Sequence, residues 1–240
     1  MSDDGFAGMP LLAHLEEFRK RIFRAVIALV VGAIVAYFFS GRIIGFLTWP
    51  VDHLIFLSPP EAFVTHLKVA LITGLALGSP YIIYQLWRFV RPALMKREAR
   101  YIIFAVIFST LFFLGGLAFA LFVIMPIGIK FLLSFENARL SAEMSIDRYV
   151  TFVSHILFTS GLVFQLPVVL FFLTKLHIVN PRMLRKGRRV AIVLIVVAAA
   201  LLTPPDVFTQ LLMVIPLLGL YELGILGSAL AARGRRDRPQ

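Results

Sequence analysis

The sequence contains no cysteine and has few charged residues. Of its 240 residues, 13 are acidic and 24 are basic, so 15% are charged and the formal net charge is +11 at pH 7. Soluble domains carry about a quarter charged residues. The absence of cysteine excludes disulfides, thiolate metal sites and cysteine nucleophiles. With 60% hydrophobic residues and a mean hydropathy of +0.90, the composition is that of a membrane protein rather than a soluble domain.

The common catalytic motifs are absent as well. No HExxH, GxSxG, P-loop or GxGxxG pattern occurs, and the five histidines lack metal-ligand spacing. We therefore expect no enzyme activity, no metal and no cofactor. Asp3 and Asp4 open the chain and no small-residue cleavage site follows the first apolar run, so we also expect no cleaved signal peptide.

The apolar residues are arranged in long blocks, which is the pattern of membrane-spanning helices. The predicted fold is an all-α polytopic membrane protein, with a single domain over 1–240. An amphipathic helix over 9–21, too polar to span, is expected to lie at the membrane surface. Six transmembrane helices are predicted after it, at about 22–39, 69–87, 101–127, 149–173, 190–203 and 207–223.

The fifth and sixth spans are predicted to be short. At a rise of 1.5 Å per residue, 190–203 reaches only about 21 Å, against a hydrocarbon core of about 30 Å. Two explanations are open. Either the membrane thins around this hairpin, or the tip of the hairpin stops short of the far surface.

The basic residues predict the orientation in the membrane. Most of the 24 lie in the N-terminal segment, in the loops at 87–100 and 174–189, and in the tail at 224–240. The positive-inside rule then places both termini, these two loops and the tail in the cytoplasm. Such segments also attract anionic lipid. Nucleic-acid binding is not expected, because no basic domain stands outside the membrane.

Four polar residues near the last three spans are candidates for function, because polar groups in hydrocarbon are costly unless paired or facing water. Gln165 lies deep in the fourth span, Asp206 and Gln210 lie one turn apart on the sixth, and Glu222 closes that helix. Each has a structural alternative. An interhelical hydrogen bond would explain Gln165 and Gln210, an N-cap would explain Asp206, and pairing with the basic tail would explain Glu222.

Glu98 is the single acid in the basic stretch WRFVRPALMKREAR at 87–100. One interpretation is a surface pair with Arg97 or Arg100 at a helix start, worth at most about 1 kcal/mol. The other is a recognition site for a cationic ligand, because a carboxylate accepts the planar guanidinium fork of arginine in a bidentate way. The residues alone favour neither.

Five motifs occur along the chain: HLEEFRKR from residue 14, SPPEAF from 58, YQLWRFVRPALMKREAR from 84, GLVFQLP from 161 and TPPDVFTQLLMVIPLLGLYE from 203. In this order and spacing they resemble the TatC family of twin-arginine translocase subunits over about 11–224. This resemblance implies six spans in a bacterial inner membrane with both termini cytoplasmic. It implies binding of the twin-arginine signal peptides of folded proteins, TatA- and TatB-like single-span partners, several copies per complex, and export driven by the protonmotive force.

The resemblance also implies site residues. The family's signal-peptide site falls on Glu17, Arg19, Phe89 and Glu98, and its outward positions of functional note fall on Pro50, Asp206 and Gln210. We expect Glu17 and Glu98 to meet the two guanidiniums of the peptide, each charge-assisted hydrogen bond contributing about 1.5–3 kcal/mol.

Two positions depart from the family pattern. Phe18 stands where the family usually has leucine, and Gln165 stands where it often has a glutamate. A glutamine carries neither a proton nor a charge, so only a hydrogen-bonding role is expected for it. Two other function classes fit six spans: a secondary transporter of small solutes with Gln165, Asp206 and Gln210 lining a path, and a structural scaffold. The sequence has neither the repeat symmetry nor the paired broken helices of transporters.

Overall fold

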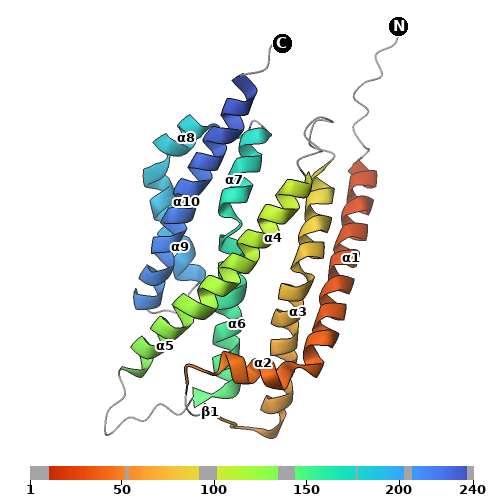
Figure 1. The fold of residues 1–240 in the computed structure, drawn as a ribbon, viewed down its shortest axis with the longest axis vertical. Helices are drawn as coiled ribbons and strands as arrows, with labels where there is room; N and C mark the ends of the chain where they lie inside the picture. Colours follow the sequence, from red (N-terminus) through yellow and green to blue (C-terminus); the bar gives the residue numbers. More distant parts are fainter. Residues whose placement is uncertain are drawn as a thin grey trace.

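The structure is a computed structural model, and it describes residues 11–51, 54–91, 102–134, 144–176, 178–202 and 207–236. The fold is a bundle of long helices with one short pair of strands (Figure 1). The first helix begins and the last helix ends at the same end of the bundle, which we call the upper face; the opposite end is the lower face.

The bundle is built from helices that run alternately between the two faces. In chain order the described elements are α1 (Leu11–Phe38), α2 (Ser40–Leu47), β1 (Leu54–Ile55), α3 (Pro59–Val90), α4 (Ile102–Phe119), the π-helix η3 (Ala120–Ile124), α5 (Met125–Leu133), β2 (Met144–Ser145), α6 (Ile146–Val163), α7 (Leu166–Lys175), α8 (Pro181–Lys186), α9 (Arg188–Leu202) and α10 (Val207–Arg236). At the lower face α2 lies across the bundle, and β1 pairs in parallel with β2.

Glycines bring pairs of helices into backbone contact. A Cβ atom on Gly74 of α3 would stand 2.4 Å from the backbone nitrogen of Ala33 in α1, and one on Gly32 would stand 2.6 Å from the carbonyl oxygen of Gly74. Gly116 of α4 meets the backbone of α6 in the same way, 2.6 Å from the carbonyl oxygen of Ser160. Membrane helices associate by such close packing, because lipid gives them no hydrophobic reason to do so.

Prolines accompany irregular turns within two of the candidate spans. Pro126 is the second residue of α5, which follows the π-helical turn η3, and Pro167 follows the break at Phe164–Gln165 between α6 and α7. Proline has no N–H to donate and its ring clashes with the carbonyl four residues earlier, so the regular hydrogen-bond ladder is interrupted there. The third crossing is therefore α4–η3–α5, and the fourth is α6–α7.

Five helices of the described chain are long and apolar enough to span a membrane: Leu15–Phe38, Pro59–Val90, Ile102–Leu133, Ile146–Lys175 and Val207–Leu230. α9, at the place of the predicted fifth span, has 15 residues, or about 22 Å, and is not among these five candidates. Its short length agrees with the prediction for 190–203, and its crossing of the membrane stays a prediction. The lower ends of α9 and α10 stop above the level that α5 and β1 reach (Figure 1).

Two predicted boundaries are wrong. The predicted surface helix at 9–21 is not separate, because its described part continues into the first span as one helix, α1, of 28 residues. The sixth helix is not short: α10 has 30 residues and includes most of the predicted tail at 224–240. The extension is held by packing that hydropathy does not reveal, with Ile225 buried and Ser228 hydrogen-bonded to Thr174 of α7 at 2.6 Å.

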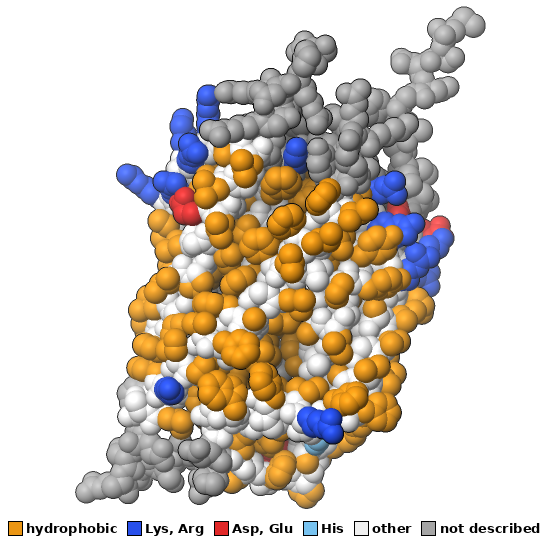
Figure 2. Space-filling view, viewed as in Figure 1, with side chains coloured by type: hydrophobic (Ala, Val, Ile, Leu, Met, Phe, Trp, Pro, Cys, Tyr) orange, Lys and Arg blue, Asp and Glu red, His pale blue; other side chains and the backbone are white. Residues whose placement is uncertain are grey.

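The surface agrees with a membrane protein. Hydrophobic side chains cover the middle of the molecule, and most of the lysine and arginine side chains in view lie toward the upper end (Figure 2). At the upper face lie the start of α1, the end of α3, the end of α7, and α8 with the start of α9. These elements carry most of the described basic residues.

Candidate binding site

Glu17 lies near the upper end of α1 and is paired within the protein. Its Oε1 accepts a hydrogen bond from Nη2 of Arg21 at 2.6 Å, and Nη1 of the same arginine donates to Oε1 of Gln85 in α3 at 3.2 Å. The Glu17 and Arg21 side chains are only 21% and 13% exposed, and Gln85 is buried. The pair therefore faces α3 and is largely covered, which makes it stronger than a solvated surface pair.

The second carboxylate oxygen of Glu17 is in a different position. Oε2 is buried and has no hydrogen-bond partner within the described residues. An ionised carboxylate accepts several hydrogen bonds, and a covered acceptor without a donor is unfavourable. One oxygen of Glu17 is thus bound by the guanidinium of Arg21, and the other is buried without a hydrogen-bond donor among the described residues.

Phe89, on the last turn of α3, contacts Phe18 of α1 with ring centroids 5.1 Å apart and an interplanar angle of 52°. The contact lies beside Glu17 in the sequence and joins the same two helices. The phenylalanine that replaces the family's usual leucine therefore extends far enough to reach Phe89, and a tilted aromatic pair contributes about 0.5–1.5 kcal/mol beyond its buried area.

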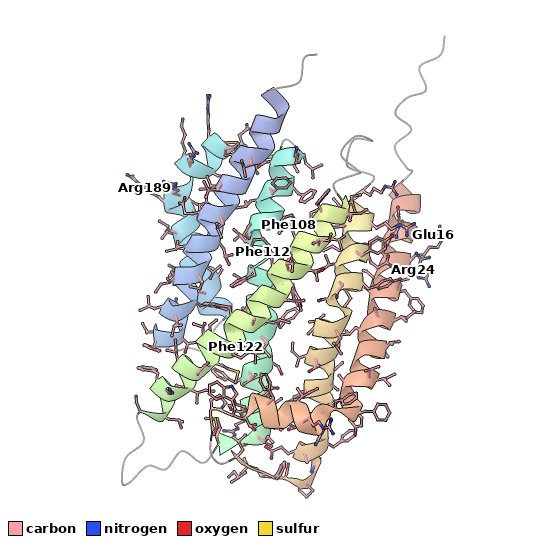
Figure 3. All side chains as sticks on the ribbon, viewed as in Figure 1. Glu16, Arg24, Phe108, Phe112, Phe122 and Arg189 are labelled. Carbon is pink, nitrogen blue, oxygen red and sulfur yellow. The ribbon has the colours of Figure 1, made fainter. Side chains whose placement is uncertain are left out.

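A second pair on α1 provides a contrast. Glu16 binds Lys20 at 2.7 Å with the same four-residue spacing, but both side chains are 64% exposed. Arg19 is exposed as well. Figure 3 shows Glu16 on the upper part of α1. One helix thus carries a covered carboxylate next to α3 and a solvated one beside it in the sequence.

Glu98 and Asp206, two of the predicted site residues, lie outside the described residues. The expected pairing of Glu17 with Glu98 stays a prediction, as does the N-cap alternative for Asp206. Pro50 is described: it lies half-buried in the turn after α2, at the lower face.

Gln165 lies at the break between α6 and α7 and binds a neighbouring helix. Its Nε2 donates to the carbonyl oxygen of Ser109 in α4 at 2.8 Å, and the Ser109 hydroxyl accepts from Nε1 of Trp87 in α3 at 2.9 Å. These two bonds link three crossings inside the membrane. The interhelical hydrogen bond that the sequence left as one alternative is therefore present.

The polar residues of α10 are also paired. Nε2 of Gln210 donates to the carbonyl oxygen of Val196 in α9 at 3.3 Å, which is again an interhelical bond. Oε2 of Glu222 accepts from Nη2 of Arg188 at 2.7 Å, and both side chains are about half exposed. Among the described side chains the partner of Glu222 is thus Arg188 at the start of α9. The pairing with the basic tail that the sequence suggested stays a prediction.

Glu61 at the lower face was not among the predicted site residues, yet it joins two distant segments. Its Oε2 accepts from the backbone nitrogens of Leu57 at 2.6 Å and Ser58 at 3.2 Å. Its Oε1 accepts from the hydroxyl of Ser145 and from the backbone nitrogen of Asp147 at 3.1 Å. The S-P-P-E spacing signals the first half of this arrangement, a capping box. Nothing in the sequence signals the second half.

Comparison with known proteins agrees with this architecture. Residues 13–216 match the family described as Sec-independent protein translocase protein (TatC). Among similar proteins, TatC of Desulforapulum autotrophicum is 41% identical over 91% of this chain and 84% of its own length. TatC of Aquifex aeolicus is 38% identical over 95% and 98%, and TatC of Escherichia coli is 33% identical over 96% and 92%.

A solved structure described as the twin-arginine translocase receptor TatC superposes on this fold with a TM-score of 0.80. It is 37% identical in sequence, and the match covers 91% of this chain and 99% of that one. The helical bundle, its span candidates and its sequence therefore lead to the same assignment. The chain belongs to the TatC family: it is a multi-pass membrane component of the Sec-independent protein translocase, and it is not an enzyme.

Proposed function

We propose that the upper face is cytoplasmic and that it binds the paired arginines in the signal peptides of folded export substrates. The observation that carries this proposal is the carboxylate of Glu17: its Oε1 accepts a hydrogen bond from Arg21, and its Oε2 is buried without a donor among the described residues. The basic elements at this face support the orientation by the positive-inside rule. The resemblance of the family motifs supports the ligand.

The chemistry of Glu17 suits a guanidinium better than an ammonium. One guanidinium of the peptide displaces the side chains that cover Oε2 of Glu17 and donates to this oxygen, and the other guanidinium binds Glu98. Arginine presents a planar fork of donors and stays charged under all conditions, whereas lysine is a strongly hydrated point charge. Since each charge-assisted hydrogen bond contributes about 1.5–3 kcal/mol, two such contacts are enough to select Arg-Arg over Lys-Lys.

The surroundings of Glu17 impose the register of the peptide. The Phe18–Phe89 contact holds α1 against α3 at this height. Arg19 is exposed nearby and repels any cationic group that is not in line with a carboxylate. Repulsion of this kind raises selectivity because it penalises the wrong ligand more than the right one.

The remaining steps of export involve partners. We propose that TatA- and TatB-like single-span proteins and further copies of this chain assemble with it in a bacterial inner membrane, and that the protonmotive force drives transport. The α9–α10 hairpin is a candidate partner surface, because its outer apolar residues are exposed and Gln210 lies between the two helices. Gln165 cannot titrate, so the driving force does not act by protonating this position.

A peptide-binding experiment tests the proposal. Purified full-length protein carrying Glu17→Gln or Glu98→Gln is compared with wild type for crosslinking of a twin-arginine peptide and of its twin-lysine analogue. Both variants are expected to lose crosslinking of the twin-arginine peptide while inserting normally, because a neutral amide offers the guanidinium one acceptor oxygen in place of two and no negative charge. Glu16→Gln is the matched control and is expected to behave as wild type, since Glu16 is exposed and paired with Lys20. Equal crosslinking in Glu17→Gln, Glu98→Gln and Glu16→Gln would refute the proposed site.

A further inference from the structure

A groove with a volume of about 560 Å³ runs along the outer side of the α1–α3 pair. Its walls are the exposed apolar side chains of Val31 and Val35 on α1 and of Leu77 on α3. α1 stands at the edge of the bundle and packs mainly on α3 (Figure 1). Because its wall residues are exposed, the groove opens to the space that lipid fills in a membrane.

The groove exists because the two helices touch through small residues. A Cβ atom on Gly78 of α3 would stand 3.3 Å from the carbonyl oxygen of Ala28 in α1. One helical turn further along the contact, the backbones of Gly32 and Gly74 touch. The backbones are therefore close along the floor, while the larger side chains on either side rise above it. The floor carries no side chain large enough to fill the space between the walls.

The upper end of the groove is cationic. Arg24 lines it, is exposed, and makes no hydrogen bond or ion pair with any described residue. The two carboxylates nearest to it on α1 are occupied, Glu16 by Lys20 and Glu17 by Arg21. Figure 3 shows Arg24 on the upper half of α1, within the apolar span Leu15–Phe38. An arginine there needs an anion or water as a partner.

An amphipathic aromatic residue stands at the same end of the groove. Tyr81 lines the groove on α3, and its ring lies 6.2 Å from that of Tyr84, whose hydroxyl accepts a hydrogen bond from Arg88 at 3.1 Å. Tyrosine and arginine together at one level are typical of the headgroup region of a bilayer. The other end of the groove, at Val35, has only apolar walls.

The length of the groove matches one leaflet. From Arg24 to Val35 α1 rises about 16 Å, which is about half of a hydrocarbon core of about 30 Å. A partner transmembrane helix would need a groove through the whole core, whereas a lipid chain needs only one leaflet. We propose that the groove binds an acyl chain of an anionic glycerophospholipid from the leaflet at the upper face, with the lipid phosphate on Arg24 and the headgroup against Tyr81.

This lipid would support the α1–α3 pair at a defined place. Glu17, Phe18 and their partners on α3 lie about two turns above Arg24 on the same two helices. A chain lying in the groove covers apolar surface of both helices at once, so its binding favours the paired arrangement. The inference is independent of the peptide-binding proposal, because it needs only the groove, the exposed side chain of Arg24 and a membrane.

Native mass spectrometry of the purified full-length protein tests this inference, with phosphatidylglycerol and zwitterionic phosphatidylcholine added in separate titrations. Wild type is expected to retain phosphatidylglycerol in preference to phosphatidylcholine. Arg24→Gln is expected to weaken phosphatidylglycerol binding about tenfold or more and to remove the preference, because a charge-assisted contact is lost. Leu77→Trp, which places a large ring in the groove, is expected to weaken binding of both lipids by similar factors.

Lys20→Gln is the matched control. It removes one positive charge from the same helix outside the groove, so its lipid preference is expected to equal that of wild type. Melting curves of all variants show whether each is folded. The inference is overturned if Arg24→Gln keeps the preference of wild type, or if Lys20→Gln loses as much as Arg24→Gln. It is also overturned if Leu77→Trp instead disrupts a dimer of the protein, which would make the groove a contact between helices of two copies.

Discussion

The two ion pairs on α1 allow one prediction to be worked out in detail. Arg21→Gln and Lys20→Gln remove the same charge from neighbouring positions, but the two pairs differ in their surroundings. Glu17 and Arg21 are 21% and 13% exposed at 2.6 Å, and Arg21 also binds Gln85 of α3. Glu16 and Lys20 are each 64% exposed at 2.7 Å. The two ion pairs therefore have nearly the same sequence spacing and N–O distance, and they differ mainly in how far their side chains are buried.

The expected magnitudes follow from that difference. An exposed pair four residues apart contributes about 0.3–0.5 kcal/mol. A largely covered, charge-assisted bond contributes more, about 1.5–3 kcal/mol before any discount for the remaining exposure. We expect Arg21→Gln to lower the free energy of unfolding by about 1–2 kcal/mol and Lys20→Gln by less than about 0.5 kcal/mol. At about 2–4 °C per kcal/mol, the first shift is measurable in a melting curve.

A double-mutant cycle isolates the pair energies. The coupling between Glu17→Gln and Arg21→Gln is expected to exceed that between Glu16→Gln and Lys20→Gln by about 1 kcal/mol. Thermal unfolding in detergent, followed by circular dichroism, measures all four single variants and both double variants. Equal coupling energies for the two pairs would show that burial next to α3 does not strengthen the Glu17 pair.

The same variant separates the role of Arg21 from that of Glu17 in binding. Removing the resident guanidinium frees both oxygens of Glu17, so an incoming arginine binds in a bidentate way and meets less repulsion. Arg21→Gln is therefore expected to bind a twin-arginine peptide at least as tightly as wild type, whereas Glu17→Gln loses binding. If folded Arg21→Gln protein loses peptide binding, the arginine contacts the peptide or positions the carboxylate, and the reasoning is wrong.

Three further predictions concern the bundle. Gly74→Leu is expected to prevent folding or lower the melting temperature strongly, because a Cβ atom there would stand 2.4 Å from the α1 backbone. Gly115→Leu is the control, and it is expected to be near neutral in the same assay because a Cβ atom there would have nothing within 4 Å. Gln165→Leu is expected to lower the free energy of unfolding by about 1 kcal/mol, because the hydrogen bond to α4 is lost, and to leave export of a folded reporter intact. Loss of export at normal stability would assign Gln165 a direct role in export. Lengthening the short apolar segment 190–203 by four leucine or valine residues is expected to impair export but not peptide binding, and normal export would remove membrane thinning from the mechanism.

The candidate site was only partly predictable. The family resemblance singled out Glu17 and Phe89, and the described structure places both at the α1–α3 contact. Arg21 was treated as one more basic residue of a topology signal, although its spacing from Glu17 is that of a helical ion pair. Spacing could not show that this pair is covered by α3 while the neighbouring Glu16 pair is solvated, because both pairs have the same sequence pattern.

The polar residues in the membrane make the same point. Hydropathy located Gln165 and Gln210 inside spans, and the sequence allowed either function or an interhelical hydrogen bond for each. The acceptor carbonyls belong to Ser109 and Val196 on other helices, and no local pattern identifies them. Likewise the end of α10 was misjudged, since the contacts of Ile225 and Ser228 with their neighbours continue the helix where hydropathy falls.

By itself the sequence determined the helical class, the approximate crossings, the short fifth span and the family, because a run of apolar residues must satisfy its backbone internally wherever it lies in lipid. Tertiary structure alone decided which carboxylate is covered, which oxygen of Glu17 lacks a hydrogen-bond donor among the described residues, and where small residues leave a groove beside Arg24. These features depend on the distance between helices far apart in the chain, and that distance is set by packing at positions such as Gly74, not by local propensity.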